Sequence, residues 1–241
     1  MRPELLSPPK NATRDFGEWY LRITTHFFLK TAGVTVFITA FFFAYFWLLR
    51  SPLFSVRTMP YTALDQAIGF QPFSLVFYLS LWVYAPLPAV LARDKPELYA
   101  YGRHSGALAL LGLGIFLFFP TKIPPADIDW SLHPGFDFLK GVDASGNACP
   151  SLHVAFAVFS AIHIGAMLKR AHVTNWIRWA NWLWCAAIAY STLATKQHVA
   201  VDLFAGAVLG ACVGLCTRQR TPLAQHSPVA ADEARVPTKH A

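Results

Sequence analysis

The chain has 241 residues, of which 55% are hydrophobic and only 14% are charged, and its mean hydropathy is +0.39. A soluble domain carries about 25% charged residues, so this composition excludes an ordinary water-soluble protein and indicates one that lies mostly in lipid. The net charge is +7, but the basic residues are scattered between apolar runs, which argues against a nucleic-acid partner.

Residues 1–26 are polar and contain no apolar core, so we expect a cytoplasmic N-terminal segment without a signal peptide. Early prolines argue against a long helix in this segment. A short amphipathic stretch around Phe16–Leu21 is suited to the membrane surface. The first apolar run that follows is therefore expected to be a retained span.

Six apolar runs predict six transmembrane helices. Their approximate bounds are Phe27–Leu49, Phe73–Leu91, Ser105–Phe119, Ser151–Leu168, Trp176–Leu193 and Val199–Cys216. Pro86 and Pro88 predict a kink in the second helix, and the third is short for about 30 Å of hydrocarbon. In the sixth, Gly206, Gly210 and Gly214 recur every four residues, a spacing that lets membrane helices approach closely. The predicted fold is all-α: a six-helix membrane domain over residues 27–216 and a disordered cytoplasmic tail over residues 217–241.

The basic residues predict the orientation of this bundle. Six spans put both termini on one side, and most Lys and Arg residues fall there: Arg2, Lys10, Arg14, Arg22, Lys30, Arg93, Lys95, Arg103, Lys169, Arg170, Arg178, Arg218, Arg220, Arg235 and Lys239. The other side holds Arg50, Arg57, Lys122, Lys140 and Lys196. The positive-inside rule then predicts cytoplasmic termini in a plasma membrane or bacterial inner membrane. His153, His198 and the loop 120–150 fall on the outer side.

The loop 120–150 is the longest polar stretch between spans, and a loop of that length is more often functional than not. Its aspartates, Asp127, Asp129, Asp137 and Asp143, are too widely spaced for a calcium site, and we expect them to be solvated. The four cysteines are too scattered for a disulfide framework or a zinc site. We predict no metal site and no cofactor.

His198 and Asp202 lie four residues apart at the start of the sixth span, in the run YSTLATKQHVAVDLFAG. This spacing puts both side chains on one face of a helix. A carboxylate that holds one imidazole nitrogen fixes the tautomer and makes the other nitrogen a better base or nucleophile. Ionisable residues in a membrane segment are costly enough to indicate function, although such a pair can equally be a structural hydrogen bond.

His153 lies at the corresponding edge of the fourth span, after Pro150, Ser151 and Leu152. A proline is well tolerated in the first turn of a helix, so we expect this helix to begin here. The unpaired N–H groups of its first turn suit an anion, and a histidine among them could protonate a leaving group. The alternative interpretation is a helix cap beside an interfacial histidine.

Lys122 and Lys196 are the cations expected near the two histidines. Either can be a lysine that only extends its ammonium group to the membrane surface. Together they would supply the positive charge that a phosphate needs. We interpret His104, His133 and His163 as structural.

Together these stretches resemble the type 2 phosphatidic acid phosphatase superfamily over roughly residues 105–216. The middle motif of that family, proline-serine-glycine-histidine, corresponds to Pro150-Ser151-Leu152-His153. Its last motif, serine-arginine, five residues, histidine, three residues and aspartate, corresponds to Ser191-Thr192, His198 and Asp202. Its first motif, lysine, six residues and arginine-proline, fails because Asp129 follows Lys122 at that spacing.

Two departures point to one branch of the family. Thr192 stands where the phosphatases have arginine, and Leu152 stands where they have glycine. This altered pattern is similar to the inositolphosphotransferase branch, the relatives of inositol phosphorylceramide synthase. Losing the arginine weakens the expected binding of a phosphomonoester, because lysine offers a point charge in place of a planar fork.

The resemblance implies an enzyme with its active site at the outer membrane face and no requirement for metal. It implies that His198 attacks phosphorus and forms a phosphohistidine, that Asp202 orients it, and that His153 protonates the leaving alcohol. Lys122, Ser151 and Lys196 are expected to bind the phosphate. The expected substrate is a lipid phosphate, with the membrane as the other partner. Water or a second alcohol can accept the phosphoryl group, so lipid phosphatase and phosphotransferase both stay open, as does the oligomeric state.

Two other interpretations remain at this point. A transporter or scaffold could keep the fold without the chemistry, and its histidines would then point apart. A bis-histidine haem protein is the other, although His153 and His198 lie at helix starts, whereas axial ligands need open space between facing helices.

Overall fold

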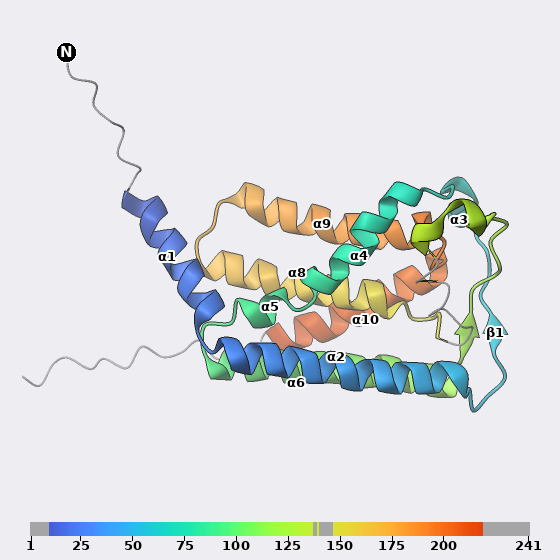
Figure 1. Cartoon of the computed structure of the whole chain (residues 1–241), viewed down its shortest axis with the longest axis horizontal. Coiled ribbons are helices and arrows are strands. Elements are labelled where there is room, and N and C mark those ends of the chain that lie inside the picture. Colours follow the sequence, from blue (N-terminus) through green and yellow to red (C-terminus); the bar gives the residue numbers. More distant parts are fainter. Residues whose placement is uncertain (1–9, 137–138, 140–146, 219–241) are drawn as a thin grey trace, which may run out of the picture.

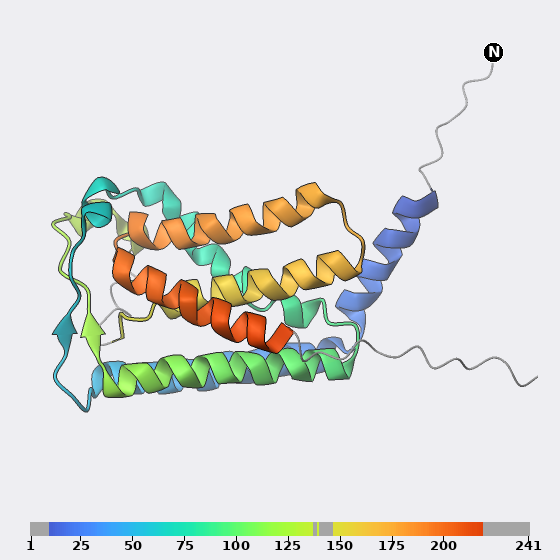
Figure 2. The same cartoon turned by 180° about the vertical axis from the view of Figure 1, so that it is seen from behind.

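The structure, a computed structural model, describes residues 10–136, 139 and 147–218 and is mostly helical (Figures 1 and 2). Its long helices lie side by side: α2 (Phe27–Arg50), α6 (Lys95–Phe118), α8 (Leu152–Arg170), α9 (Asn175–Ala194) and α10 (Ala200–Arg218). A further segment in the same bundle is broken into η1 (Pro72–Ser74), α4 (Leu75–Tyr84) and α5 (Leu87–Val90). The break at Pro86 confirms the predicted kink, because proline removes a helical hydrogen bond.

Four of the described helical segments are long and apolar enough to cross a membrane: Phe27–Arg50, Pro72–Val90, Leu152–Arg170 and Ala200–Thr217. Helices α6 and α9 do not meet that criterion, although both run through the bundle alongside the others (Figure 2). Both carry polar residues within their length, among them Arg103 and Arg178. A mostly helical structure is therefore confirmed, and its apolar helices indicate a membrane protein, while the count of six spans stays a prediction.

Helix α6 shows where the predicted bounds were wrong. The third span was predicted to begin at about Ser105, but the charged stretch before that residue forms the first turns of a 24-residue helix. Asp94 caps this helix by accepting a hydrogen bond from the backbone N–H of Glu97, and Pro96 lies in the first turn. At 1.5 Å per residue, α6 is roughly 36 Å long, so it is not short for the hydrocarbon layer.

The N-terminal segment also differs from its prediction, because α1 (Lys10–Thr24) is a 15-residue helix. The prolines that argued against a helix all precede it. Lys30 fixes α1 to the bundle: its buried ammonium donates to the carbonyls of Val90 and Ala92, each at 2.8 Å, and to that of Arg22 at the end of α1. Lys30 was counted from the sequence as a charge on the cytoplasmic side. In the structure it instead donates hydrogen bonds to carbonyls at the ends of helices.

The connections at the opposite end of the bundle from α1 form a small cap (Figure 1). Strand β1 (Arg57–Thr58) pairs in parallel with β2 (Thr121–Lys122), and the short helix α3 (Ala63–Ala67) follows β1. Two short 3-10 turns, η2 (Trp130–Leu132) and η3 (Pro134–Phe136), occupy the long loop. These strands are a small correction to the all-α prediction. The solvated positions predicted for Asp137 and Asp143, and the disordered tail over residues 219–241, lie outside the described residues.

Helix α8 lies at the centre of the bundle and α10 packs directly against it. In the apolar part of α8, 67% of the residues are buried inside the protein, whereas in that of α2 only 11% are. A Cβ atom added at Gly206 would lie 2.2 Å from the carbonyl oxygen of Ser151, and one at Gly210 would lie 2.2 Å from that of Ala155. At Gly214 the nearest atom is the side-chain tip of Ile162, at 2.8 Å. The prediction from the glycine spacing is therefore confirmed: the glycines of α10 let its backbone lie against the backbone of α8.

Candidate active site

The turn from α9 to α10 holds His198 and Asp202 in contact. The carbonyl of Thr192 accepts hydrogen bonds from the backbone N–H groups of Gln197 and His198, each at 3.1 Å, which ends α9 and turns the chain. Nδ1 of His198 lies 2.8 Å from Oδ2 of the fully buried Asp202. Because a carboxylate only accepts, Nδ1 carries the hydrogen and Nε2 has the lone pair. Such an imidazole can act as a nucleophile or a base.

The Asp202 carboxylate also binds the start of its own helix. Its Oδ1 accepts a hydrogen bond from the backbone N–H of Val199 at 2.8 Å. Each oxygen of this buried carboxylate therefore has a donor, which offsets the cost of removing the charge from water. The pairing predicted from the four-residue spacing is present in the structure.

His153 lies in the first turn of α8, where Ser151 caps the helix. Oγ of Ser151 accepts a hydrogen bond from the backbone N–H of Val154 at 3.3 Å. The imidazole of His153 stacks on Tyr78 of α4, with ring centroids 4.0 Å apart and an angle of 17° between the rings. Its Nε2 is buried, and in the described part of the chain it has no hydrogen-bond partner. Stacking thus fixes the ring while leaving one nitrogen available to a ligand.

The two histidine sites are joined through the backbone. The N–H of Ser151 donates to the carbonyl of Asp202 at 2.9 Å, beside the close approach of Gly206. His153 and His198 both line the same cavity. The structure therefore brings together the two histidines that the non-catalytic interpretation expected to point apart. Ser151 itself is fully buried with its Oγ engaged in the cap, so its role in binding a phosphate stays a prediction.

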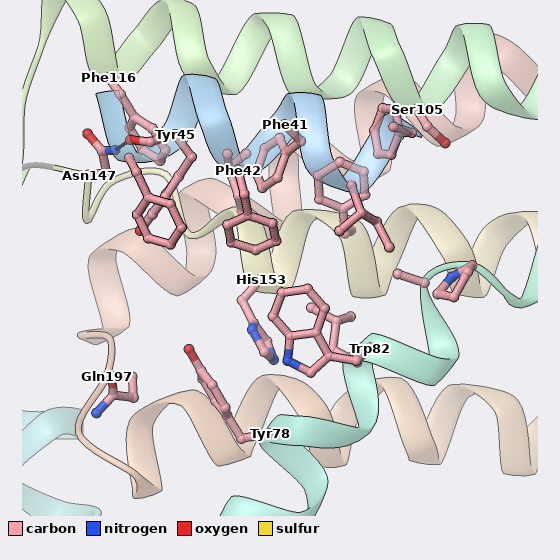
Figure 3. Close-up of a pocket in the computed structure, with 18 of the residues that line it drawn as sticks. Phe41, Phe42, Tyr45, Tyr78, Trp82, Ser105, Phe116, Asn147, His153 and Gln197 are labelled. Atoms are coloured by element: carbon pink, nitrogen blue, oxygen red, sulfur yellow. Dashed lines mark hydrogen bonds between the residues drawn. The ribbon is translucent and has the colours of Figure 1, made fainter. Parts of the chain in front are cut away.

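The cavity has a volume of about 1230 Å³ and is mostly apolar. Figure 3 shows aromatic side chains of α2 (Phe41, Phe42 and Tyr45) on one side and Tyr78 and Trp82 of α4 on the other, with His153 near them. Its lining continues along α2 as far as Leu29, close to the end of the bundle opposite the histidines. Drug-sized ligand sites have about 300–1,000 Å³, so this cavity is large enough for a long apolar molecule.

The two predicted lysines have different surroundings. Both line the cavity, and Lys122 is exposed on β2. The ammonium of Lys196 instead donates to the carbonyl of Asp65 at 2.9 Å, to the hydroxyl of Tyr61 at 3.3 Å and to the carbonyl of Ile68. In this arrangement Lys196 ties the turn before His198 to α3, and Lys122 is the better placed of the two for a phosphate.

We predict that Lys196→Ala lowers the free energy of unfolding by about 1–3 kcal/mol, because the partly buried carbonyls of Asp65 and Ile68 lose their donor. Lys196 has a left-handed backbone with φ 56°, a conformation that costs about 1 kcal/mol for lysine and alanine alike and that glycine adopts without this cost. Thermal unfolding in detergent should therefore rank the proteins as wild type, then Lys196→Gly, then Lys196→Ala. An unchanged melting temperature with a raised KM for a phosphate substrate would instead assign Lys196 to the phosphate.

Thr192, at the position of the family's arginine, is fully buried, and its Oγ1 donates to the carbonyl of Ala189 at 2.7 Å. Cys149 lies near Asp202, and burial together with that carboxylate raises the pKa of its thiol to about 11, so it stays protonated.

His104 and His163, with ring centroids 6.1 Å apart, lie away from the cavity lining, and His133 packs on Phe70 with ring centroids 4.8 Å apart. Among the described residues no cluster of three or more His, Cys, Asp or Glu side chains could hold a metal ion.

Sequence reasoning missed two residues of this region. Tyr78 carries no sequence signal, because an aromatic residue in an apolar span is ordinary. Asp65 is buried and binds the start of α10 from the loop before the second span. The spacing Thr62-Ala-Leu-Asp65 is a capping-box pattern, which could have indicated a helix start but not the contact with α10.

A profile of the PAP2 superfamily matches residues 72–224, more than half of the chain. The chain belongs to the PAP2 superfamily. The PAP2 match runs from η1 through α10 and includes His153, His198 and Asp202, while α1, α2, β1 and α3 precede it. No curated protein and no solved structure matches the chain. PAP2 proteins are generally phosphatases, so membership indicates phosphatase-type phosphoryl transfer by a membrane-associated protein.

Proposed function

We propose that this PAP2 protein transfers the phosphoryl group of a lipid phosphate through a phosphohistidine on His198, at the outer face of the membrane. The observation that carries the proposal is that His153 and His198, the latter held by the buried Asp202, line one end of a large apolar cavity. A polar reaction centre beside an apolar cavity suits a molecule with a phosphate at one end and a hydrocarbon chain at the other.

The geometry supports a two-step reaction. Nε2 of His198 attacks phosphorus, the bond from phosphorus to the lipid oxygen breaks, and His153 in its protonated form gives that oxygen a proton. Water or a second alcohol then attacks the phosphohistidine, His153 takes back a proton, and the bond from phosphorus to Nε2 breaks. Asp202 holds the imidazole in the required tautomer and stabilises its positive charge.

The site offers few positive charges to the oxygens of the transferred phosphoryl group. Phosphoryl transfer depends mostly on positioning and on cations that stabilise the equatorial oxygens. Here the family's last-motif arginine is replaced by a buried threonine, and Lys122 is the exposed cation that lines the cavity among the described residues near the histidines. We therefore assign phosphate binding mainly to Lys122, with Ser151 and Lys196 nearby.

The motif variant supports the inositolphosphotransferase branch, in which an alcohol in place of water accepts the group. Residues Ser151-Leu152-His153 and Ser191-Thr192 carry this part of the proposal. The distribution of basic residues supports six spans, cytoplasmic termini and an extracytoplasmic site in a plasma or bacterial inner membrane. In the structure α1 lies at the end of the bundle opposite the starts of α8 and α10, and α10 runs toward that end, which agrees with that orientation (Figure 2).

The test uses purified protein in lipid vesicles with three substrates: phosphatidic acid, a prenyl diphosphate, and phosphatidylinositol together with ceramide. Released phosphate reports hydrolysis, and a new phosphosphingolipid reports transfer. Substrate labelled in the phosphate group should also label the protein with an alkali-stable, acid-labile phosphohistidine at His198. If no substrate is turned over and no label reaches the protein, the non-catalytic interpretation replaces this proposal.

A further inference from the structure

Helix α3 lies outside the region that the PAP2 profile matches, yet it contacts the chain on both sides of His198. Two residues before His198, the ammonium of Lys196 donates to the carbonyls of Asp65 and Ile68. Two residues after it, the backbone N–H of Ala200 donates to Oδ1 of Asp65 at 2.7 Å. One short helix therefore holds both flanks of the histidine.

The Asp65 carboxylate is almost fully buried, at 2% exposure, and each of its oxygens has a backbone donor. Oδ1 accepts from Ala200, while Oδ2 accepts from the N–H and the hydroxyl of Thr62, at 2.8 and 2.7 Å. Burying a carboxylate without such donors would cost several kcal/mol of folding free energy. The buried position of Asp65 therefore depends on the N–H of Ala200 at the start of α10. Asp65 thus links the start of α10 to the cap of the bundle.

The first turn of α10 shares its N–H groups between two carboxylates. Val199 donates to Asp202 and Ala200 donates to Asp65, and both carboxylates lie at the positive end of the helix dipole. The turn between α9 and α10 has no regular secondary structure at His198. Its position is set by the Thr192 carbonyl on one side and by α3 on the other. A second contact of the same kind joins the N–H of Gln71 to the carbonyl of Ala194 at 2.9 Å.

We infer that Asp65 is a positioning residue for the reaction at His198, and that α3 is part of the catalytic unit. The inference rests on the proposed function. Asp65 does not touch the cavity; it acts by holding Ala200, and through that residue the His198–Asp202 pair, at a fixed distance from His153. A misplacement of about 1 Å at a reacting group can cost about 10²-fold in rate, so a second-layer hydrogen bond of this kind has a measurable effect on kcat.

The variants Asp65→Asn and Asp65→Ala separate positioning from folding. Asparagine has the same shape, but it offers one acceptor oxygen to two backbone N–H groups, so it can satisfy Thr62 or Ala200 but not both. Alanine satisfies neither. We expect kcat to fall about 3–10-fold in Asp65→Asn and about 30–100-fold in Asp65→Ala, with KM within about twofold of wild type. The control is Asp127→Ala, an exposed aspartate in the long loop, which should leave kcat unchanged.

A second readout does not depend on turnover. Diethyl pyrocarbonate modifies accessible neutral imidazoles, and mass spectrometry of peptides can report the rate at His198 separately. We expect this rate to change at least threefold in Asp65→Asn and more in Asp65→Ala. If Asp65→Ala does not fold, Asp65→Asn alone decides.

Wild-type kcat and wild-type modification of His198 in folded Asp65→Asn would overturn the positioning role, as would a loss confined to KM or to the melting temperature. Those outcomes would leave the proposed function standing. The proposed function fails instead if His198→Ala is active or if no phosphohistidine forms, whatever the Asp65 variants do.

Discussion

Replacing His198 with alanine should lower kcat by about 10⁴-fold or more on every lipid phosphate that the wild-type protein turns over. Removing a covalent nucleophile leaves only the residual catalysis that binding and charge stabilisation supply. Asp202→Asn should cost less, about 10²–10⁴-fold, because the imidazole keeps its place but loses the partner that fixes its tautomer. Single-turnover assays with phosphate-labelled substrate measure both losses directly.

The matched control is His172→Asn, which removes a histidine at the opposite end of α8. His172 is exposed and has a left-handed backbone with φ 53°, a conformation that asparagine tolerates well. This variant should keep full activity and the same melting temperature. Activity of His198→Ala equal to wild type would remove the phosphohistidine from the mechanism, even if His153→Ala were inactive.

The bundle could be predicted from sequence because its helices are specified locally. Apolar runs, the prolines at 86 and 88 and the glycine spacing in α10 each act within one helix or between two neighbours. The His198–Asp202 contact was predictable for the same reason, since four residues along a helix bring two side chains together. The start of α6 was missed because charged residues in a helix's first turns resemble a loop in composition, although Asp94 and Pro96 marked the cap.

The supporting contacts of the site could not be predicted, because they join residues far apart in sequence. Lys196 resembled a phosphate ligand, and only the fold shows that carbonyls of α3 surround its ammonium. Lys30 was counted as a charge at the membrane edge, whereas it binds the end of α5 across some sixty positions of the chain. Stacking of Tyr78 on His153 is of the same kind. Buried polar groups nearly always form hydrogen bonds, but the sequence does not show which residue is the partner of each group.

These contacts suggest why the site can lack the family's arginine and still keep its shape. The Thr192 carbonyl and α3 hold the turn that carries His198, while Tyr78 and the Ser151 cap hold His153. The remaining link is the distance between α8 and α10, which Gly206 and Gly210 allow to be short, and Gly206 is the one of the two that lies beside Ser151.

Gly206→Ala should therefore reduce kcat by about 10²-fold. The new Cβ would lie 2.2 Å from the carbonyl oxygen of Ser151, a backbone atom that cannot rotate away, so α10 must move from α8. That movement separates His198 and Asp202 from His153, and about 1 Å is enough for such a loss. Overpacking costs about 1–3 kcal/mol, partly offset by about 1 kcal/mol of better helix propensity, so the protein should still fold. Steady-state kcat together with thermal unfolding in detergent measures the two effects.

Two glycines of the same chain provide graded controls. At Gly214 the added Cβ meets the side-chain tip of Ile162 at 2.8 Å, which can move, and this position is far from the histidines. At Gly114 in α6 nothing lies within 4 Å. Gly214→Ala should lose less than fivefold in kcat, and Gly114→Ala should match wild type. If all three variants lost activity equally, or if Gly206→Ala kept it, the spacing of α8 and α10 would not control the reaction. A loss at Gly206 alone, in folded protein, would mean that the close contact of Gly206 with Ser151 also aligns the two histidines.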